Sequence, residues 1–132
     1  MRHALGARRL CGDMKILIVD DNAILAFIIQ EMLESEGFET RVATDARRGY
    51  WTFLLFNPDL VITDLQMAGQ NGLALMSEIR VHNPRINTIY MSVDASPYKA
   101  SLEEEKKRHQ AGFLEKPFSK MELMRMIVES LD

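Results

Sequence analysis

Five short segments of the chain are rich in apolar residues and are separated by longer segments with a helical pattern. The apolar segments occupy residues 15–20, 38–43, 59–64, 87–92 and 112–115. The first, third and fourth are nearly continuous apolar runs, which is typical of strands covered on both faces of a sheet. The segment 38–43 alternates more regularly between apolar and polar residues, which favours a strand at the edge of the sheet.

The intervening segments carry residues that start helices. Ser96 followed by Pro97 predicts the N-cap and the first residue of the fourth helix. Ser119 and Glu122 have the spacing of a capping box at the start of the fifth helix. Strand and helix thus alternate five times, which predicts a three-layer α/β fold, a five-stranded parallel sheet with five helices on its two faces. The other expected helices lie between residues 22 and 37, over about residues 45–56, and over about residues 73–82.

Length and composition limit the class of protein. A chain of 132 residues fits one domain, and its 47% hydrophobic and 27% charged residues are typical of a globular chain rather than a disordered one. The net charge of −3 argues against nucleic-acid binding by charge alone. Residues 1–13 contain three of the arginines and lack the apolar pattern, so we expect a flexible leader there and a domain over residues 14–132.

Cysteine usage and hydropathy bear on the location of the chain. Cys11 is the single cysteine, so a disulfide within the chain is excluded. No apolar run approaches the roughly 18 residues that a membrane-spanning helix needs. The leader also lacks the continuous apolar segment of a secretory signal. We therefore expect a cytoplasmic protein without a membrane partner.

Charged and polar residues stand at the ends of four predicted strands. Asp20 and Asp21 follow the first strand, while Asp64, Ser92 and Lys116 come at the ends of the third, fourth and fifth. Because ligands bind beyond the carboxyl ends of parallel strands, we expect these side chains to meet at one pole. Carboxylates packed this closely repel one another unless a cation intervenes, and oxygen ligands of this kind suit Mg²⁺. The set predicts phosphoryl transfer to Asp64, which depends mainly on positioning and charge neutralisation.

In this order and at these elements, the residues resemble the receiver domain of two-component response regulators, over about residues 14–131. Pro117 and Phe118, directly after Lys116, strengthen the resemblance. It implies a flavodoxin-like fold with the strand order 2-1-3-4-5. It also implies that Asp64 accepts a phosphoryl group from a phosphohistidine on a sensor histidine kinase or a histidine phosphotransfer protein. The chain would then be a signalling module rather than an enzyme.

The resemblance implies a role for each matching residue at the acidic pole. Asp20, Asp21, Asp64 and the backbone carbonyl of Gln66 correspond to the ligands of Mg²⁺, or of Mn²⁺ in its place. Of the acidic pair, we expect Asp21 to bind the ion directly and Asp20 to act partly through water. Lys116 corresponds to the lysine that pairs with the phosphoryl group.

Three further positions match the parts of the family that respond to phosphorylation. Ser92 corresponds to the switch hydroxyl, Phe113 to the switch aromatic residue, and Pro117 to a proline whose preceding peptide bond is commonly cis. Phosphorylation is expected to draw Ser92 toward the phosphoryl group and to let Phe113 pack inward. The surface of the fourth helix, fifth strand and fifth helix would change, and it would bind an output partner or a second copy in a homodimer.

Two positions depart from the family's usual pattern. Ala68 stands where the family has a proline after Met67, and Gly69 follows, so we expect a looser loop after the phosphoacceptor. Phe113 lacks the hydroxyl of the more usual tyrosine. By the same resemblance, Gln66 and Asp94 flank the path of an attacking water, which predicts a fairly short-lived phosphoryl group.

The sequence suggests which residues contact the phosphodonor and leaves more than one function open. Ile24 and Phe27 are apolar residues near the acidic pair and, with Pro117, are expected to contact the phosphodonor. The chain could instead be a receiver-like binding module that works without phosphorylation, or an aspartyl phosphatase. Gln66 argues against a phosphatase, because such enzymes usually carry an acid/base aspartate at that position. The sequence is compatible with a single-domain regulator and with the receiver part of a longer protein.

Overall fold

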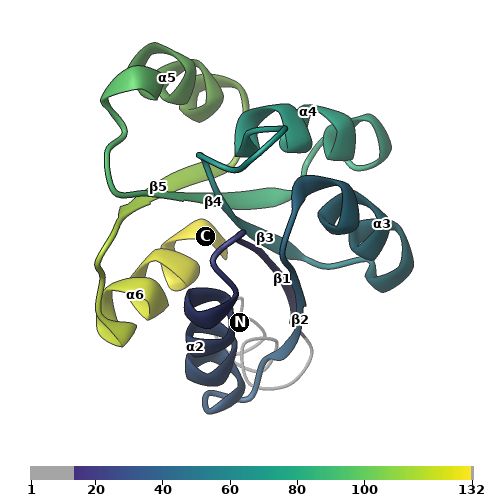
Figure 1. The fold of residues 1–132 in the computed structure, drawn as a ribbon, viewed down its shortest axis with the longest axis vertical. Helices are drawn as coiled ribbons and strands as arrows, with labels where there is room; N and C mark the ends of the chain where they lie inside the picture. The colour runs from purple at the N-terminus through teal and green to yellow at the C-terminus, as the bar shows by residue number, and fades with distance from the viewer. Residues whose placement is uncertain (1–13, 132) are drawn as a thin grey trace, which may run out of the picture.

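A five-stranded parallel sheet forms the centre of the computed structural model, which describes residues 14–131 (Figure 1). The strand order is β2-β1-β3-β4-β5, so the predicted order and the edge position of the second strand are confirmed. The expected leader, residues 1–13, lies outside the described residues. The strands are β1 (Lys15–Val19), β2 (Glu39–Ala43), β3 (Leu60–Asp64), β4 (Asn87–Ser92) and β5 (Ala111–Glu115).

Helices cover both faces of the sheet, which gives the three predicted layers (Figure 1). One face packs against α2 and α6, and the other packs against α3, α4 and α5. Their bounds are α2 (Ala23–Glu34), α3 (Ala46–Phe56), α4 (Gly72–His82), the short 3₁₀ helix η2 (Ser96–Tyr98), α5 (Lys99–Arg108) and α6 (Lys120–Leu131).

Two separate cores result from the alternation of side chains along each strand. In β1, Ile16 and Ile18 join the core under α2 and α6, whereas Leu17 and Val19 join the core under α3, α4 and α5. All four are fully buried, which explains the continuous apolar run of this strand. The buried strand therefore fixes the position at which the following carboxylates emerge.

Side chains cap most of the helices. Asn22, Asp45 and Asn71 each accept a hydrogen bond from the backbone N–H three residues later, at the starts of α2, α3 and α4. Ser119 and Glu122 exchange the two bonds of the predicted capping box at the start of α6, which is confirmed. The helix starts on which the site depends are thus fixed by local sequence.

The start of the fourth α-helix differs from the prediction. Ser96 does not cap α5, because Ser96, Pro97 and Tyr98 form the 3₁₀ helix η2 and α5 begins only at Lys99, without a side-chain cap. The backbone N–H of Ser96 donates to the Asp94 carboxylate at 3.0 Å, which forms a local turn before η2. Without a side-chain cap, α5 is less firmly started than α2, α3, α4 and α6.

Candidate functional site

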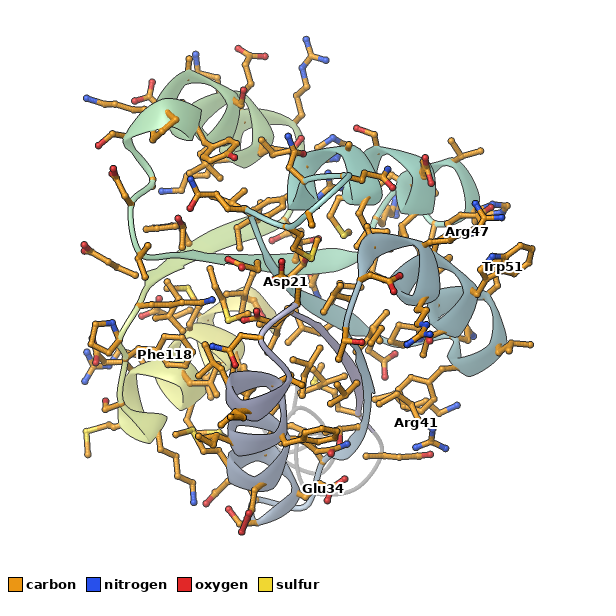
Figure 2. All side chains as sticks on the ribbon, viewed as in Figure 1. Asp21, Glu34, Arg41, Arg47, Trp51 and Phe118 are labelled. Carbon is orange, nitrogen blue, oxygen red and sulfur yellow. The ribbon has the colours of Figure 1, made fainter. Side chains whose placement is uncertain are left out.

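Three carboxylates meet at the carboxyl end of the sheet, beyond β1 and β3. One oxygen each of Asp20, Asp21 and Asp64 lies within 4.8 Å of the other two. Asp20 is fully buried and Asp64 is nearly so, whereas Asp21 is exposed. Figure 2 marks Asp21 where the chain leaves β1 for α2. The predicted convergence of these residues is confirmed, and their oxygen atoms form a donor set that suits Mg²⁺ or Mn²⁺.

Lys116 supplies the positive charge of the site from the end of β5. Its Nζ lies 2.9 Å from Asp20 Oδ2 and 3.4 Å from Asp64 Oδ1. The side chain is largely buried, so both contacts are only weakly screened by solvent. The backbone of Lys116 is held as well, because its N–H donates to the carbonyl oxygen of Ser92 at 2.9 Å. The Lys116–Pro117 peptide bond is cis, as the resemblance implied.

The electrostatic balance at Asp64 has two opposing parts. Burial raises the pKa of the Asp64 carboxyl above its ordinary value, since the charged form loses solvation. Lys116 lowers this pKa, and the carboxylates of Asp20 and Asp21 raise it again. The net effect is a raised pKa, so the ionised form of Asp64 is less favoured in the folded protein than in water.

The oxygens of Asp20 and Asp21 are held differently. Asp20 accepts the backbone N–H of Asn22 on Oδ1 and the Lys116 ammonium on Oδ2, both at 2.9 Å. Asp21 Oδ2 accepts the backbone N–H of Ala68 at 3.3 Å. Asp20 is therefore fixed within the fold, while Asp21 faces solvent with a weaker tie.

The loop after β3 is held by backbone contacts that side-chain patterns do not reveal. Ala68 donates its N–H to Asp21, which the proline usual at this position could not do. The N–H of Gly72 donates to the carbonyl oxygen of Leu65 at 3.0 Å. A Cβ on Gly72 would lie 2.3 Å from the Asp64 carbonyl oxygen, so only glycine fits against the phosphoacceptor backbone. The contribution of Ala68 could not be predicted, because it is a backbone group.

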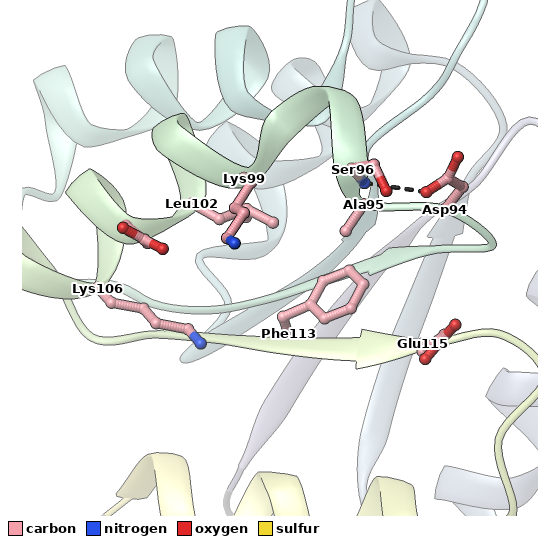
Figure 3. Close-up of a pocket in the computed structure, with 9 residues that line it drawn as sticks. Asp94, Ala95, Ser96, Lys99, Leu102, Lys106, Phe113 and Glu115 are labelled. Carbon is pink, nitrogen blue, oxygen red and sulfur yellow. Dashed lines mark hydrogen bonds between the residues drawn. The ribbon is translucent and has the colours of Figure 1, made fainter.

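Ser92 ends β4 and Phe113 lies within β5, and each has neighbours outside the carboxylate cluster. The hydroxyl of buried Ser92 donates to the Asp94 carbonyl oxygen at 2.9 Å and accepts the Asp94 N–H at 3.1 Å. Phe113 is half-buried and lines a hollow of about 420 Å³ between α5 and β5, together with Asp94 and Leu102 (Figure 3). Gln66 and Asp94 are both exposed beside the pole.

The predicted docking residues are exposed at the same end of the molecule. Ile24 is 76% exposed and Phe27 is 55% exposed, both on α2, and Pro117 is exposed directly after Lys116. Large apolar side chains left in solvent are a common feature of binding surfaces. The three residues therefore remain available to a partner that approaches Asp64.

Comparison with known proteins identifies the family. Residues 16–128 match the model of the response regulator receiver domain, and the chain belongs to that family. The transcriptional regulatory protein RprY of Bacteroides fragilis (strain YCH46) is 29% identical over 110 residues, which are 83% of this chain and 46% of RprY. The chain thus spans less than half the length of that relative. Response regulators are components of two-component signalling systems, and this chain is a receiver module of that kind.

Solved structures support the same assignment. A response regulator receiver domain protein from Clostridium thermocellum has a TM-score of 0.79 and 25% identity, with 89% of this chain and 94% of that chain covered. A CheY-like receiver domain protein from Methanospirillum hungatei JF-1 has a TM-score of 0.80 and 26% identity, with 90% and 94% covered. Within residues 14–131, no helix is long and apolar enough to cross a membrane.

Proposed function

We propose that this chain accepts a phosphoryl group on Asp64 from a phosphohistidine donor, either a sensor histidine kinase or a histidine phosphotransfer protein. The observation that carries the proposal is the cluster of three carboxylate oxygens within 4.8 Å, with Lys116 Nζ 3.4 Å from Asp64. Membership of the receiver family supports it. The phosphoryl group would change the surface formed by α5, β5 and α6, which corresponds to the output surface expected from the sequence.

Asp20, Asp21, Asp64 and the backbone carbonyl of Gln66 would hold Mg²⁺ or Mn²⁺. When bound, the ion would supply positive charge for the oxygens of the transferring phosphoryl group. Both oxygens of Asp20 already accept hydrogen bonds, whereas Asp21 has only a long bond from Ala68 on Oδ2. This difference favours Asp21 as the direct ligand and Asp20 as a group acting partly through water.

The transfer makes one bond at Asp64 and breaks one bond in the donor. A carboxylate oxygen of Asp64 attacks phosphorus, the P–N bond to the donor imidazole breaks, and the imidazole takes up a proton from solvent. Asp64 must be ionised to attack, although burial raises its pKa. Lys116 lowers that pKa and is close enough to pair with the arriving phosphoryl oxygens. Its contact with Asp20 holds the ammonium in place.

The response of the chain would begin at Ser92. Its hydroxyl would leave the backbone of Asp94 and donate to a phosphoryl oxygen, which removes the pair of bonds that now joins these residues. Phe113 would then pack further into the hollow beneath α5. The altered surface of α5, β5 and α6 would bind an output partner or a second copy of this chain. Met121 and Val128, exposed on α6, supply apolar area there.

The phosphoryl group would be removed by hydrolysis. Water would attack phosphorus, the P–O bond to Asp64 would break, and inorganic phosphate would leave. Gln66 and Asp94 are exposed beside this path and offer an amide and a carboxylate that orient water. We infer a fairly short phosphoryl lifetime, to be measured as the decay half-life. An unchanged half-life in the Gln66→Ala/Asp94→Ala variant would contradict these roles.

Beryllofluoride with Mg²⁺ tests the proposed response, because this reagent forms a stable analogue of an aspartyl phosphate. We expect backbone NMR shifts at Ser92, at Phe113 and along α5 when it is added to the native chain. Asp64→Asn should show none of these shifts. Equal shifts in both proteins would contradict the assignment of Asp64. An absence of shifts in both would favour a binding module that works without phosphorylation.

A further inference from the structure

Few side chains hold the helix α5 to the rest of the protein. Leu102 and Glu105 are the two residues of α5 that are not exposed to solvent. They are three positions apart and so lie on the same face of the helix. α5 also begins without a side-chain cap. The position of α5 therefore depends strongly on what Glu105 contacts.

Glu105 joins α5 to two other elements through one oxygen atom. Its Oε1 accepts a hydrogen bond from the Tyr90 hydroxyl at 2.6 Å and an ion-pair contact from Nη1 of Arg80. Nη2 of Arg80 donates to the Thr88 hydroxyl at 3.2 Å. Arg80 comes from α4, while Tyr90 and Thr88 come from β4. One carboxylate thus connects α4, β4 and α5.

The contact of Glu105 with Arg80 and Tyr90 is buried. Burial strengthens the contact, and it also makes the loss of one partner destabilising for the group that remains. The side chains of Arg80 and Glu105 are 7% and 18% exposed, and Tyr90 is fully buried. Burial and the bond to Glu105 raise the pKa of Tyr90 above its ordinary value, so its hydroxyl stays protonated as a donor. Loss of Glu105 would leave a buried guanidinium without its carboxylate.

The contact is also incomplete, and a hollow lies elsewhere along α5. Nε of Arg80 is buried without a hydrogen-bond partner among the described residues. The hollow of about 420 Å³ next to α5 is lined by Lys99 and Leu102 of the helix and by Phe113 of β5 (Figure 3). α5 is therefore tied to α4 and β4 by one buried polar contact and borders an open hollow on the side of Phe113. The hollow gives α5 space to move to a second position.

We propose that Arg80, Glu105 and Tyr90 form a latch that holds α5 in its resting position, and that phosphorylation must compete with this latch to move the helix. The proposal rests on the proposed function, because it concerns the regulation of the same output surface. Tyr90 lies two residues before Ser92, so both side chains lie on the same face of β4. A shift of Ser92 toward a phosphoryl group is transmitted along β4 to the Tyr90–Glu105 bond. The latch sets the fraction of molecules in which α5 is released.

Hydrogen exchange of the unphosphorylated protein tests the latch directly. Glu105→Gln removes the charge and keeps the shape of the side chain. Glu104→Gln is the matched control, because this neighbour is exposed and pairs only at the surface with Arg108 at 3.2 Å. We expect amides of α5 to exchange about tenfold faster in Glu105→Gln, as for the loss of a charged hydrogen bond, with α3 little changed. Glu104→Gln should match the native chain.

The second measurement is the beryllofluoride concentration that gives half-saturation in the presence of Mg²⁺. Glu105→Gln should lower this concentration by about the same factor by which it accelerates hydrogen exchange in α5. The reason is that less of the free energy of beryllofluoride binding is then used to release α5. Unchanged exchange in α5, or equal acceleration in α3 and α5, would overturn the latch. If the α5 amides exchange faster in Glu105→Gln but the half-saturating beryllofluoride concentration is unchanged, the latch has no regulatory role.

Tyr90→Phe keeps the test decisive if Glu105→Gln does not fold. It removes one hydroxyl and no charge, and it should change both measurements in the same direction by a smaller factor. No change in Tyr90→Phe would overturn the proposal. A native chain that does not respond to beryllofluoride would overturn the proposed function and the regulatory role, while the exchange comparison would still decide whether the latch exists.

Discussion

The ammonium of Lys116 and the carboxylate of Asp20 form a contact of 2.9 Å across 96 positions of the sequence. It joins the ends of β1 and β5, which are separated in the sheet by β3 and β4. Asp20 is fully buried, so its charge requires a partner within the fold. This pairing fixes Lys116 beside Asp64, whereas Asp21 is held only by the 3.3 Å bond from Ala68.

Removal of one carboxylate should weaken metal binding. Asp21→Asn takes away a unit charge close to the expected ion, so the affinity for Mg²⁺ should fall by roughly tenfold or more. Isothermal titration calorimetry measures this change. Asp45→Asn is the control, since Asp45 caps α3 and asparagine is an equally good cap. Equal affinities for Mg²⁺ in Asp21→Asn and the native chain would contradict the assignment of the ligands.

The raised pKa of Asp64 predicts a pH-dependent gain in stability for Asp64→Asn in the absence of divalent ions. Because burial raises the pKa of the folded state above the unfolded value near 3.8, ionised Asp64 destabilises the fold at neutral pH. That cost shrinks as the pH falls through the folded pKa and vanishes below the unfolded one. Thermal unfolding with a chelator should therefore show a higher Tm for Asp64→Asn at pH 7, and the difference should close as the pH approaches 3.8.

Asp94→Asn is the control for the thermal unfolding experiment, because the pKa of Asp94 is lowered rather than raised. Hydrogen bonds from Ser96 lower the pKa of the Asp94 carboxyl, so its ionised form favours the folded state. Asp94→Asn should not raise the Tm at pH 7. If both variants raise it equally, general relief of negative charge is the cause, rather than the burial of Asp64.

The close approach of Gly72 to Asp64 predicts a specific defect in Gly72→Ala. The added Cβ would lie 2.3 Å from the Asp64 carbonyl oxygen, so the phosphoacceptor backbone must shift. We expect a loss of about 1–3 kcal/mol in the free energy of unfolding, measured by chemical denaturation, and slower phosphorylation by acetyl phosphate.

Gly69→Ala is the control for Gly72→Ala, because it strains the loop backbone without displacing the backbone of Asp64. Gly69 has φ +88° and no atom within 4 Å of an added Cβ. Its substitution should cost about 1–2 kcal/mol through backbone strain alone and leave the phosphorylation rate close to native. A native rate in Gly72→Ala would show that the fit against Asp64 does not matter for the reaction.

The exposed apolar residues of α2 should matter for protein donors only. Phe27→Ala is expected to raise the KM for a phosphorylated histidine phosphotransfer protein by about tenfold, as for the loss of a central contact. Its phosphorylation by acetyl phosphate should be unchanged. Val81→Ala, which alters a 78% exposed residue on α4, is the control and should leave both rates unchanged. A larger effect of Val81→Ala would place the docking surface on α4.

Much of this fold could be predicted because local pattern and global topology agree. The continuous apolar run of β1 is buried in both cores, and the alternating β2 is an edge strand. The carboxylates could be found because each ends a strand, and parallel strands bring their carboxyl ends to one pole. The capping box of Ser119 and Glu122 is equally local.

The parts that could not be predicted depend on tertiary contacts or on backbone groups. The N–H of Ala68 has no side-chain pattern to reveal its bond to Asp21. Ser96 resembles an N-cap, but it lies in the 3₁₀ helix η2, and no side chain caps η2 or α5. Glu105 resembles any charge on an exposed helix, and only the fold brings it to Arg80 and Tyr90. Tyr90, within the apolar run of β4, carries a hydroxyl that needs a partner when buried, but its sequence position does not name Glu105 as that partner.

Intact-mass measurement after incubation with acetyl phosphate and Mg²⁺ tests the central proposal most directly. The native chain should gain the mass of one phosphoryl group and lose it again on standing, while a chelator should prevent the gain. Asp64→Asn should show no gain under the same conditions. An equal gain in Asp64→Asn, or no gain in the native chain with acetyl phosphate or any phosphohistidine donor, would contradict the assignment of Asp64 as the phosphoacceptor.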